Sequence, residues 1–343
     1  MKRIMSLALA FLMMVSLAAC GSSKQETSEA PKEEQSEQST QETQYYSVGT
    51  ASSGGMMYAI GSGWASLMND VTDGKYQFTA EETAGNTANI AMIESGELEF
   101  CCNGIMSLYE GYEGTAEWTG GTQYKNIRVM FPMNQMVLTA YTLSDTGITT
   151  LSDLNGKVVG LGSKGGAMDS LFRQLFDILG IVPADIYNDG WAATVSALSD
   201  GTIDAGITMQ LAPAAALVEL QATKDVTFLT FSDEELDTLK ELNPAFSDSV
   251  IAAGSYNSIT EDIKTVGDIA VMCCSADMPD DVVYDLVKTT FEHQDDMRLT
   301  HNAMANWSIE RAASVIAQYH PGALKYYDEM GITIPEPTVV PHD

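Results

Sequence analysis

Residues 150–179 read TLSDLNGKVVGLGSKGGAMDSLFRQLFDIL, and this stretch decides the fold class. Its apolar runs and glycines predict a short helix over 151–154, a strand over 157–161 and a helix over 166–179. A strand, a glycine-rich loop and a helix in that order are typical of a βαβ unit with parallel strands.

The same alternation continues on both sides of this stretch. Further strands are expected at 45–49, 76–81, 98–102, 205–208 and 226–230, and helices at 56–70, 86–95, 192–199 and 213–221. Long β-like runs at 127–143, 250–253 and 266–274 accompany three helices expected at 279–294, 309–319 and 321–330. The chain is therefore predicted to be α/β with mainly parallel sheets.

Composition excludes several classes of partner. The 343 residues include 17 Lys and Arg against 47 Asp and Glu, a formal net charge of −30. Nucleic acids and anionic lipids are bound through clustered basic residues, so neither is an expected partner. Hydrophobic residues make up 45% of the chain, which is enough for a buried core.

The N-terminus has the pattern of an export signal. Lys2 and Arg3 precede an apolar run over 4–19, which is shorter than the roughly 20 residues of a membrane-spanning helix. The run ends in Leu-Ala-Ala-Cys20, which resembles the lipobox of bacterial lipoproteins, although an ordinary signal with a chance cysteine is the alternative. We expect a signal peptide over 1–19, a lipid anchor on Cys20, and a protein tethered outside the cytoplasm. Residues 20–44 are polar and are expected to form a disordered tether.

Signatures of metal binding and catalysis are missing from the sequence. Apart from Cys20, the cysteines form two adjacent pairs, Cys101-Cys102 and Cys273-Cys274, with no C-x-x-C spacing. The four histidines have no ligand spacing with them. There is no G-x-S-x-G, H-E-x-x-H or P-loop motif. We therefore expect no metal, no cofactor and no enzymatic activity.

The loop after the expected strand 157–161 contains a G-x-G-x-x-G motif, Gly160 to Gly165. Asp185 lies 20 residues beyond it, as in a dinucleotide-binding fingerprint. Export, and the lack of a convincing second strand at Asp185, favour a small carboxylate instead. Free backbone N–H groups at a helix N-terminus bind anions, and Ser163 and Lys164 add a hydroxyl and a cation.

Two further loops have the same donor-rich character. Ser52, Ser53, Gly54 and Gly55 follow the first expected strand, and Thr83-Ala-Gly-Asn86 follows the second. Trp191 precedes a helix and is expected to contact either the ligand or the facing lobe.

Several stretches resemble known families. Residues 150–160 and 197–205 resemble stretches shared by type 2 periplasmic binding proteins. More specific stretches resemble the TAXI family of TRAP-transporter solute receptors, in order along the chain from about residue 46 to residue 331: 49–61, 83–97, 251–256, 277–284 and 320–327. Gly104 stands where that family often has a polar side chain, and Asn103 is a candidate substitute.

The resemblance implies a two-lobed type 2 periplasmic-binding-protein fold with the ligand cleft between the lobes. Each lobe would be a mainly parallel sheet flanked by helices, with lobe 1 over 45–141 and 250–343 and lobe 2 over 142–249. It also implies a partner, a TRAP permease driven by an ion gradient, and a small carboxylate ligand of amino-acid or dicarboxylate type. A receptor for an ATP-driven importer is the first alternative, and an exported α/β hydrolase is the second.

The motifs and the resemblance together give one set of candidate ligand-binding residues: Ser52, Ser53, Gly54, Gly55, Tyr58, Thr83, Asn86, Asn103, Ser163, Lys164, Gly165, Trp191, Thr208 and Tyr256. In such a sheet the third strand lies beside the strand returning from the other lobe, which would bring the two cysteine pairs together. They are expected to be buried free thiols or, alternatively, to form an interstrand disulfide.

Overall fold

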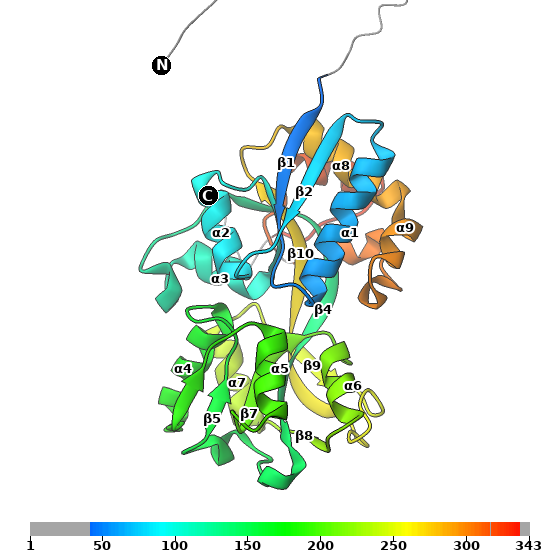
Figure 1. The fold of residues 1–343 in the computed structure, drawn as a ribbon. Helices are drawn as coiled ribbons and strands as arrows, with labels where there is room; N and C mark the ends of the chain where they lie inside the picture. Colours follow the sequence, from blue (N-terminus) through cyan, green and yellow to red (C-terminus); the bar gives the residue numbers. More distant parts are fainter. Residues whose placement is uncertain (1–41, 316, 337–343) are drawn as a thin grey trace, which may run out of the picture. The chain divides into compact units, whose positions relative to one another are not determined.

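The computed structural model describes residues 42–315 and 317–336. The predicted signal peptide, Cys20 and nearly all of the predicted tether lie outside the described residues. Within the described part, a 10-stranded sheet has the order β2-β1-β3-β10-β4-β7-β5-β6, with β8 paired to β4 and β9 to β10 (Figure 1). No helix in these residues is long and apolar enough to cross a bilayer.

The first lobe contains the N-terminal elements and the C-terminal helices. Its strands are β1 (Gln44–Gly49), β2 (Tyr76–Glu81) and β3 (Phe100–Gly104), and β1 is parallel to both neighbours. Its helices are α1 (Met56–Val71), α2 (Asn86–Ser95), α3 (Ile105–Glu113), α8 (Asp280–Glu292), α9 (Gln294–Leu299) and α10 (Pro321–Glu329).

The second lobe repeats the βα alternation. Its strands are β5 (Val158–Gly160), β6 (Asp185–Tyr187), β7 (Ala205–Gln210) and β8 (Val226–Phe228), with β5 parallel to β6 and β7. Its helices are α4 (Ala167–Leu179), α5 (Trp191–Ser199), α6 (Ala215–Gln221) and α7 (Asp233–Leu242).

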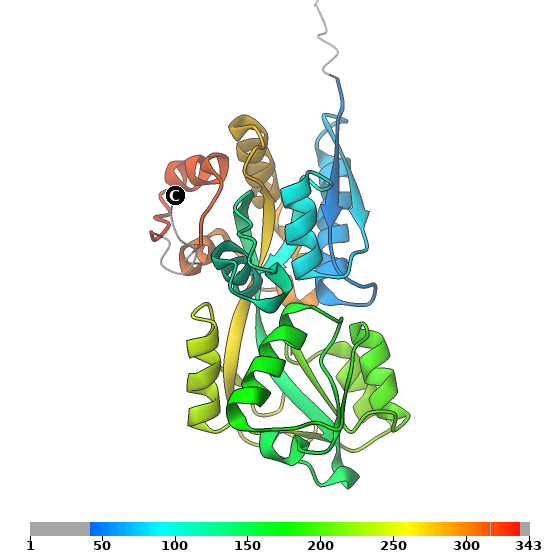
Figure 2. The same ribbon diagram turned by 90° about the vertical axis from the view of Figure 1, so that its left-hand side faces the viewer.

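Two long antiparallel strands connect the lobes, β4 (Ile127–Leu143) and β10 (Ile263–Ser275). One end of β10 pairs with β3 in the first lobe, and the other end pairs with β9 (Ser247–Ile251). The distal half of β4 pairs with β7 and β8 in the second lobe. Both strands can be followed between the two groups of helices in Figure 2.

The predicted α/β fold class is confirmed, with a sheet that is mixed because β4 and β10 run against their neighbours. The predicted helix over 309–319 is wrong. A 3-10 helix covers Ile309–Ser314, and Tyr319 then forms a parallel bridge with Val129 of β4. Hydrogen bonds from Val129 N–H to Gln318 O and from His320 N–H to Val129 O replace helical bonds there.

The predicted lobe boundaries remain predictions. Strand β4 runs without a break through the predicted boundary at 141/142. Ile251, Tyr256 and Ile259, which the prediction assigns to lobe 1, share a buried cluster with Leu198 and Phe228 of the second lobe. Strand β9, which ends at Ile251, pairs with β10 near the predicted boundary at 249/250.

The two cysteine pairs lie on adjacent strands, as the resemblance implies. Cys101 of β3 is the register partner of Cys273 of β10, and all four cysteines are buried free thiols. Burial raises the thiol pKa of Cys102, Cys273 and Cys274, so the reactive thiolate is scarce at neutral pH.

We expect none of these four thiols to react with a maleimide in the native protein, and all four to react after unfolding. Intact mass before and after labelling is the measurement. A mass gain of two hydrogens on reduction would instead reveal an interstrand disulfide.

Candidate functional site

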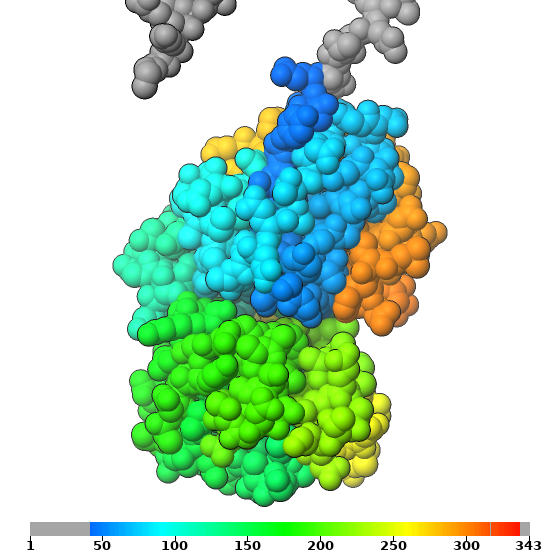
Figure 3. Space-filling model, viewed as in Figure 1, coloured from blue at the N-terminus to red at the C-terminus, as the bar shows by residue number. Residues whose placement is uncertain are grey.

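A cavity of about 180 Å³ lies between the two lobes. A buried cavity of about 150 Å³ can hold benzene, so this volume suits a small solute. Its lining includes the loops after β1 and β2 in the first lobe and after β5 and β6 in the second. Parallel strands present the loops at their carboxyl ends along one edge, which brings these loops together. On the face shown in Figure 3, the blue segment containing α1 meets the green segment containing α4 and α5.

Four helices begin at this cavity, and each has a glycine N-cap. Gly55 of α1, Gly85 of α2, Gly166 of α4 and Gly190 of α5 all line it. Among the described residues, no side chain caps any of these four N-termini. First-turn N–H groups lack partners within the helix and lie at the positive end of its dipole. The cavity therefore has a donor-rich surface suited to an anion.

Six of the predicted site residues line the cavity: Ser52, Gly55, Asn86, Ser163, Trp191 and Thr208. Trp191 is the first residue of α5, and its ring meets that of Tyr141 edge to face, with centroids 5.9 Å apart. The Tyr141 hydroxyl is buried and has no hydrogen-bond partner among the described residues. Gly206 of β7 lies under the Tyr141 ring, where a Cβ would overlap the ring atoms.

The other eight predicted residues lie outside the cavity lining: Ser53, Gly54, Tyr58, Thr83, Asn103, Lys164, Gly165 and Tyr256. Gly54 and Tyr58 lie on either side of the α1 N-cap Gly55. Ser53 donates from both its backbone N–H and its hydroxyl to the Glu82 carboxylate, so these donors are already used.

Thr83 and Asn103 support the loop before α2. The Thr83 hydroxyl donates to Thr50 O at 3.2 Å and accepts from Gly85 N–H. Asn103 is fully buried, and its amide donates to Asn86 O at 3.1 Å. Both side chains thus position the N-terminus of α2 through contacts within the protein.

Tyr256 and Lys164 are also outside the lining. The Tyr256 hydroxyl accepts from Ala214 N–H at 2.7 Å, and its ring packs on Phe228 within the second lobe. The Lys164 side chain is exposed. No lysine or arginine occurs among the cavity-lining residues, all of which belong to the described chain.

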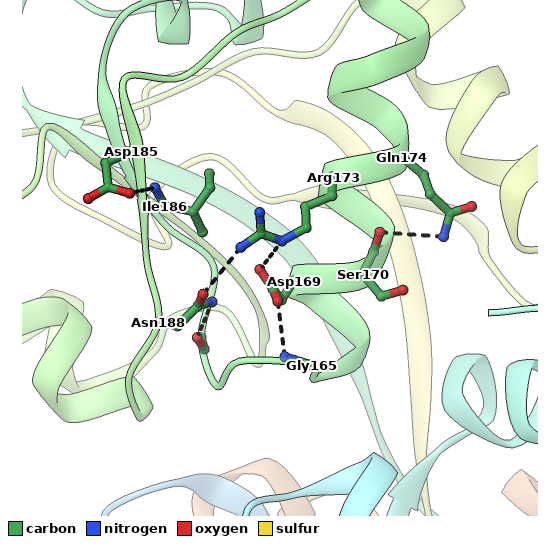
Figure 4. Close-up of polar contacts among 9 residues, drawn as sticks. Gly165, Asp169, Ser170, Arg173, Gln174, Asp185, Ile186 and Asn188 are labelled. Atoms are coloured by element: carbon green, nitrogen blue, oxygen red, sulfur yellow. Dashed lines mark hydrogen bonds and ion pairs between the residues drawn. The ribbon is translucent and has the colours of Figure 1, made fainter. Parts of the chain in front are cut away.

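The glycine-rich loop before α4 is held by an internal polar network (Figure 4). Asp169 accepts from Gly165 N–H at 3.0 Å and from Arg173 Nε at 2.8 Å. Arg173 also donates to Asn188, whose amide donates to Gly162 O. The Gly165 N–H is therefore occupied, while the loop is fixed with Ser163 on the cavity side.

Asp185 does not serve as the acidic residue of a dinucleotide site. It begins β6 and pairs with Val158, whereas the glycine-rich loop follows Gly160 at the other end of β5. Its carboxylate accepts from Ile186 N–H (Figure 4). The strand that the sequence did not predict at 185–187 is present, but its acid lies at the wrong end for a ribose.

Sequence reasoning missed Asp268, the one cavity-lining residue in the described chain whose side chain is a carboxylate. Asp268 is 1% exposed, and its Oδ1 accepts from Met106 N–H at 3.0 Å and from Ile269 N–H at 2.9 Å. Oδ2 has no partner among the described residues. One sequence feature could have identified it: Asp268 is a lone acid inside the apolar run that forms β10.

Methionines supply much of the apolar lining: Met56, Met57, Met106, Met136, Met168 and Met209. Because the thioether chain is unbranched and polarisable, such a wall adapts to the shape of an apolar group.

Two buried acids near the cavity titrate unusually. Burial raises the pKa of Asp268 to about 7, helped by the charge of Glu110 and opposed by its backbone donors. Burial likewise raises the pKa of Glu110 to about 7, although Trp118 and Asn243 donate to it. In the unfolded chain both acids have ordinary values near 4.

The folded protein therefore keeps these two protons while the unfolded chain releases them, so their contribution to stability falls as pH rises from about 4 to about 7. We expect Asp268→Asn to reduce the decrease in the free energy of unfolding between pH 5 and pH 8. Urea unfolding at these two pH values is the measurement. A pH 5 to pH 8 difference identical to that of wild type would contradict this assignment.

Residues 48–331 match the NMT1-like family. The chain belongs to this family. No curated protein matches the chain.

Two solved structures resemble this NMT1-like protein at low identity, which establishes its type 2 periplasmic-binding-protein fold alone. The periplasmic binding protein BugD is 14% identical with a TM-score of 0.53, over 85% of this chain and 99% of that one. A structure from work on glutathione import via GshT and the cystine ABC importer TcyBC of Streptococcus mutans is 11% identical with a TM-score of 0.50, over 77% and 96%.

Proposed function

We propose that this NMT1-like protein is an extracytoplasmic solute receptor that captures a small carboxylate and delivers it to a membrane permease. The observation that carries the proposal is the convergence of four glycine-capped helix N-termini, two from each lobe, on one cavity. A carboxylate in this cavity accepts from backbone N–H groups and from the hydroxyls of Ser52, Ser163 and Thr208.

Local donors have to provide the binding energy. The chain carries a net charge of −30, so its distant field repels an anion. That field is screened beyond about 8–10 Å at physiological salt, whereas direct hydrogen bonds to a charged group act at contact distance. A solute that touches both lobes binds the closed arrangement preferentially, and this differential affinity drives closure.

The permease is proposed to be of the TRAP type, on the resemblance of the sequence to TAXI receptors. Its transport would be driven by an ion gradient without ATP. A receptor for an ATP-driven importer is the alternative. Uptake into proteoliposomes that contain a permease able to bind this protein separates the two, because only the TRAP type accumulates solute with an ion gradient and no ATP.

A thermal-shift screen against small carboxylates tests the receptor proposal. The panel contains the amino acids, C4 and C5 dicarboxylates and monocarboxylates, each with its amide as a matched control lacking the charge. We expect at least one carboxylate to raise the melting temperature while its amide does not. Stabilisation by neutral or cationic solutes alone would contradict the carboxylate proposal.

The lipid anchor is proposed on Cys20. We expect the mature N-terminus in native membranes to be a diacylated Cys20, because the lipobox is complete and the apolar run is short. Mass spectrometry of the N-terminal peptide is the measurement. A mature N-terminus at another residue, without lipid, would show that the chain has an ordinary signal.

A further inference from the structure

The acid in the cavity points to a second charged group on the solute. We propose, resting on the carboxylate proposal above, that Asp268 binds an ammonium group, so that the solute is a zwitterionic amino acid with an uncharged side chain. Three features of the site support this assignment.

The first feature is the free oxygen of Asp268. Its Oδ1 caps α3 by accepting from Met106 N–H, a task that an asparagine or serine oxygen performs equally well. Its Oδ2 is buried and has no hydrogen-bond partner among the described residues, and Asp268 is one of the residues that line the cavity. A buried carboxylate oxygen without a partner is costly, and an ammonium donor in the cavity removes that cost.

The second feature is the space around Oδ2. A Cβ built on Gly104 would overlap Asp268 Oδ2, so the missing side chain leaves the room that this oxygen occupies. Asn86 Nδ2 lies 3.3 Å from the same built Cβ, and both Asn86 and Asp268 line the cavity. The side chains of Asn86 and Asp268 thus lie close together in the cavity lining, while other parts of the lining supply the N–H donors of helix N-termini.

The third feature is the balance of charge and apolar surface. Among the cavity-lining residues of the described chain, no lysine or arginine offsets Asp268. A second carboxylate on the solute would be repelled by this acid, whereas an ammonium is attracted by it. The methionine wall accommodates an apolar side chain rather than a charged one.

Calorimetry with matched solutes tests the proposal on the wild-type protein. Each apolar or small neutral amino acid is compared with its deaminated acid, for example L-leucine with 4-methylpentanoate, and with its decarboxylated amine, 3-methylbutylamine; succinate represents the dicarboxylates. We expect at least one amino acid to bind more than tenfold more tightly than its deaminated acid and more tightly than succinate. The proposal is overturned if a deaminated acid or succinate binds as tightly as any amino acid, or if no amine-bearing solute binds.

Two variants connect the preference to the residue. Asp268→Asn keeps the oxygen that caps α3, and we expect it to reduce the preference for the amino acid to less than threefold. Glu110→Gln is the matched control, because Glu110 is also a buried acid with a raised pKa but does not line the cavity. An unchanged preference in Asp268→Asn, or an equal loss in Glu110→Gln, would overturn the assignment. Binding of the amines without any carboxylate would refute the carboxylate proposal and leave the role of Asp268 intact.

Discussion

Replacing Ser163 by aspartate should weaken carboxylate binding by more than a hundredfold. Ser163 lines the cavity in the loop that ends at Gly166, the N-cap of α4. An aspartate there places a negative charge where the solute carboxylate is proposed to lie. Two like charges 5–6 Å apart repel by about 3 kcal/mol at an effective dielectric constant of about 20, and each 1.4 kcal/mol is tenfold in Kd. Calorimetry with the best carboxylate from the screen is the measurement.

Two variants serve as controls for this charge effect. Ser163→Ala removes one neutral donor to a charged group and is expected to cost about 1.5 kcal/mol, a tenfold weaker Kd. Lys164→Ala removes the exposed cation next to it, which lies outside the cavity lining, so we expect less than a threefold change. If Lys164→Ala instead weakens carboxylate binding ten- to a hundredfold, the Lys164 ammonium contacts the solute. Equal affinities for wild type and Ser163→Asp would place the solute away from α4.

Trp307→Ala should lower the free energy of unfolding by about 3–5 kcal/mol. Trp307 is fully buried and stacks on Phe291 of α8 with centroids 4.5 Å apart and an interplanar angle of 7°. Its indole N–H donates to Pro132 O of β4 at 2.6 Å. The truncation leaves a cavity and removes the donor to a buried carbonyl. The expected loss is a large fraction of the roughly 5–15 kcal/mol that stabilises a typical domain.

Urea unfolding of the wild type and two variants measures this effect. Trp307→Phe keeps an aromatic ring beside Phe291 but loses the donor to Pro132, so we expect it to cost about 1–2 kcal/mol. A cost below 1 kcal/mol for Trp307→Ala would mean that Trp307 does not pack on Phe291 and β4 as described.

The backbone of the site could be predicted from sequence because local chemistry determines it. A strand followed by Gly and Ser and then an amphipathic run indicates a loop that ends at a helix N-terminus, as at Gly55, Gly85 and Gly166. The same reasoning leads to Ser52, Asn86 and Ser163 as candidate ligand-binding residues, and all three line the cavity. Which of these residues bind a solute stays a prediction.

The missed features depend on contacts between distant parts of the chain. Asp268 faces the cavity only because β10 runs beside β3 and brings it to the N-terminus of α3, more than 160 residues away in sequence. The segment after Ser314 has a helical pattern but bonds to Val129 of β4 instead. Lys164 is predicted as a site residue for its charge, whereas in the structure it is exposed and outside the cavity lining. Its contact with a solute stays a prediction.

The proposed receptor binds a solute carboxylate with helix N-termini in the cavity between the lobes. A crystal structure with the best-binding carboxylate shows whether it does. We predict carboxylate oxygens within about 2.7–3.2 Å of backbone N–H groups in the first turns of helices from both lobes, among α1, α2, α4 and α5. A solute bound outside this cavity, or one whose carboxylate contacts none of these N-termini, would contradict the account.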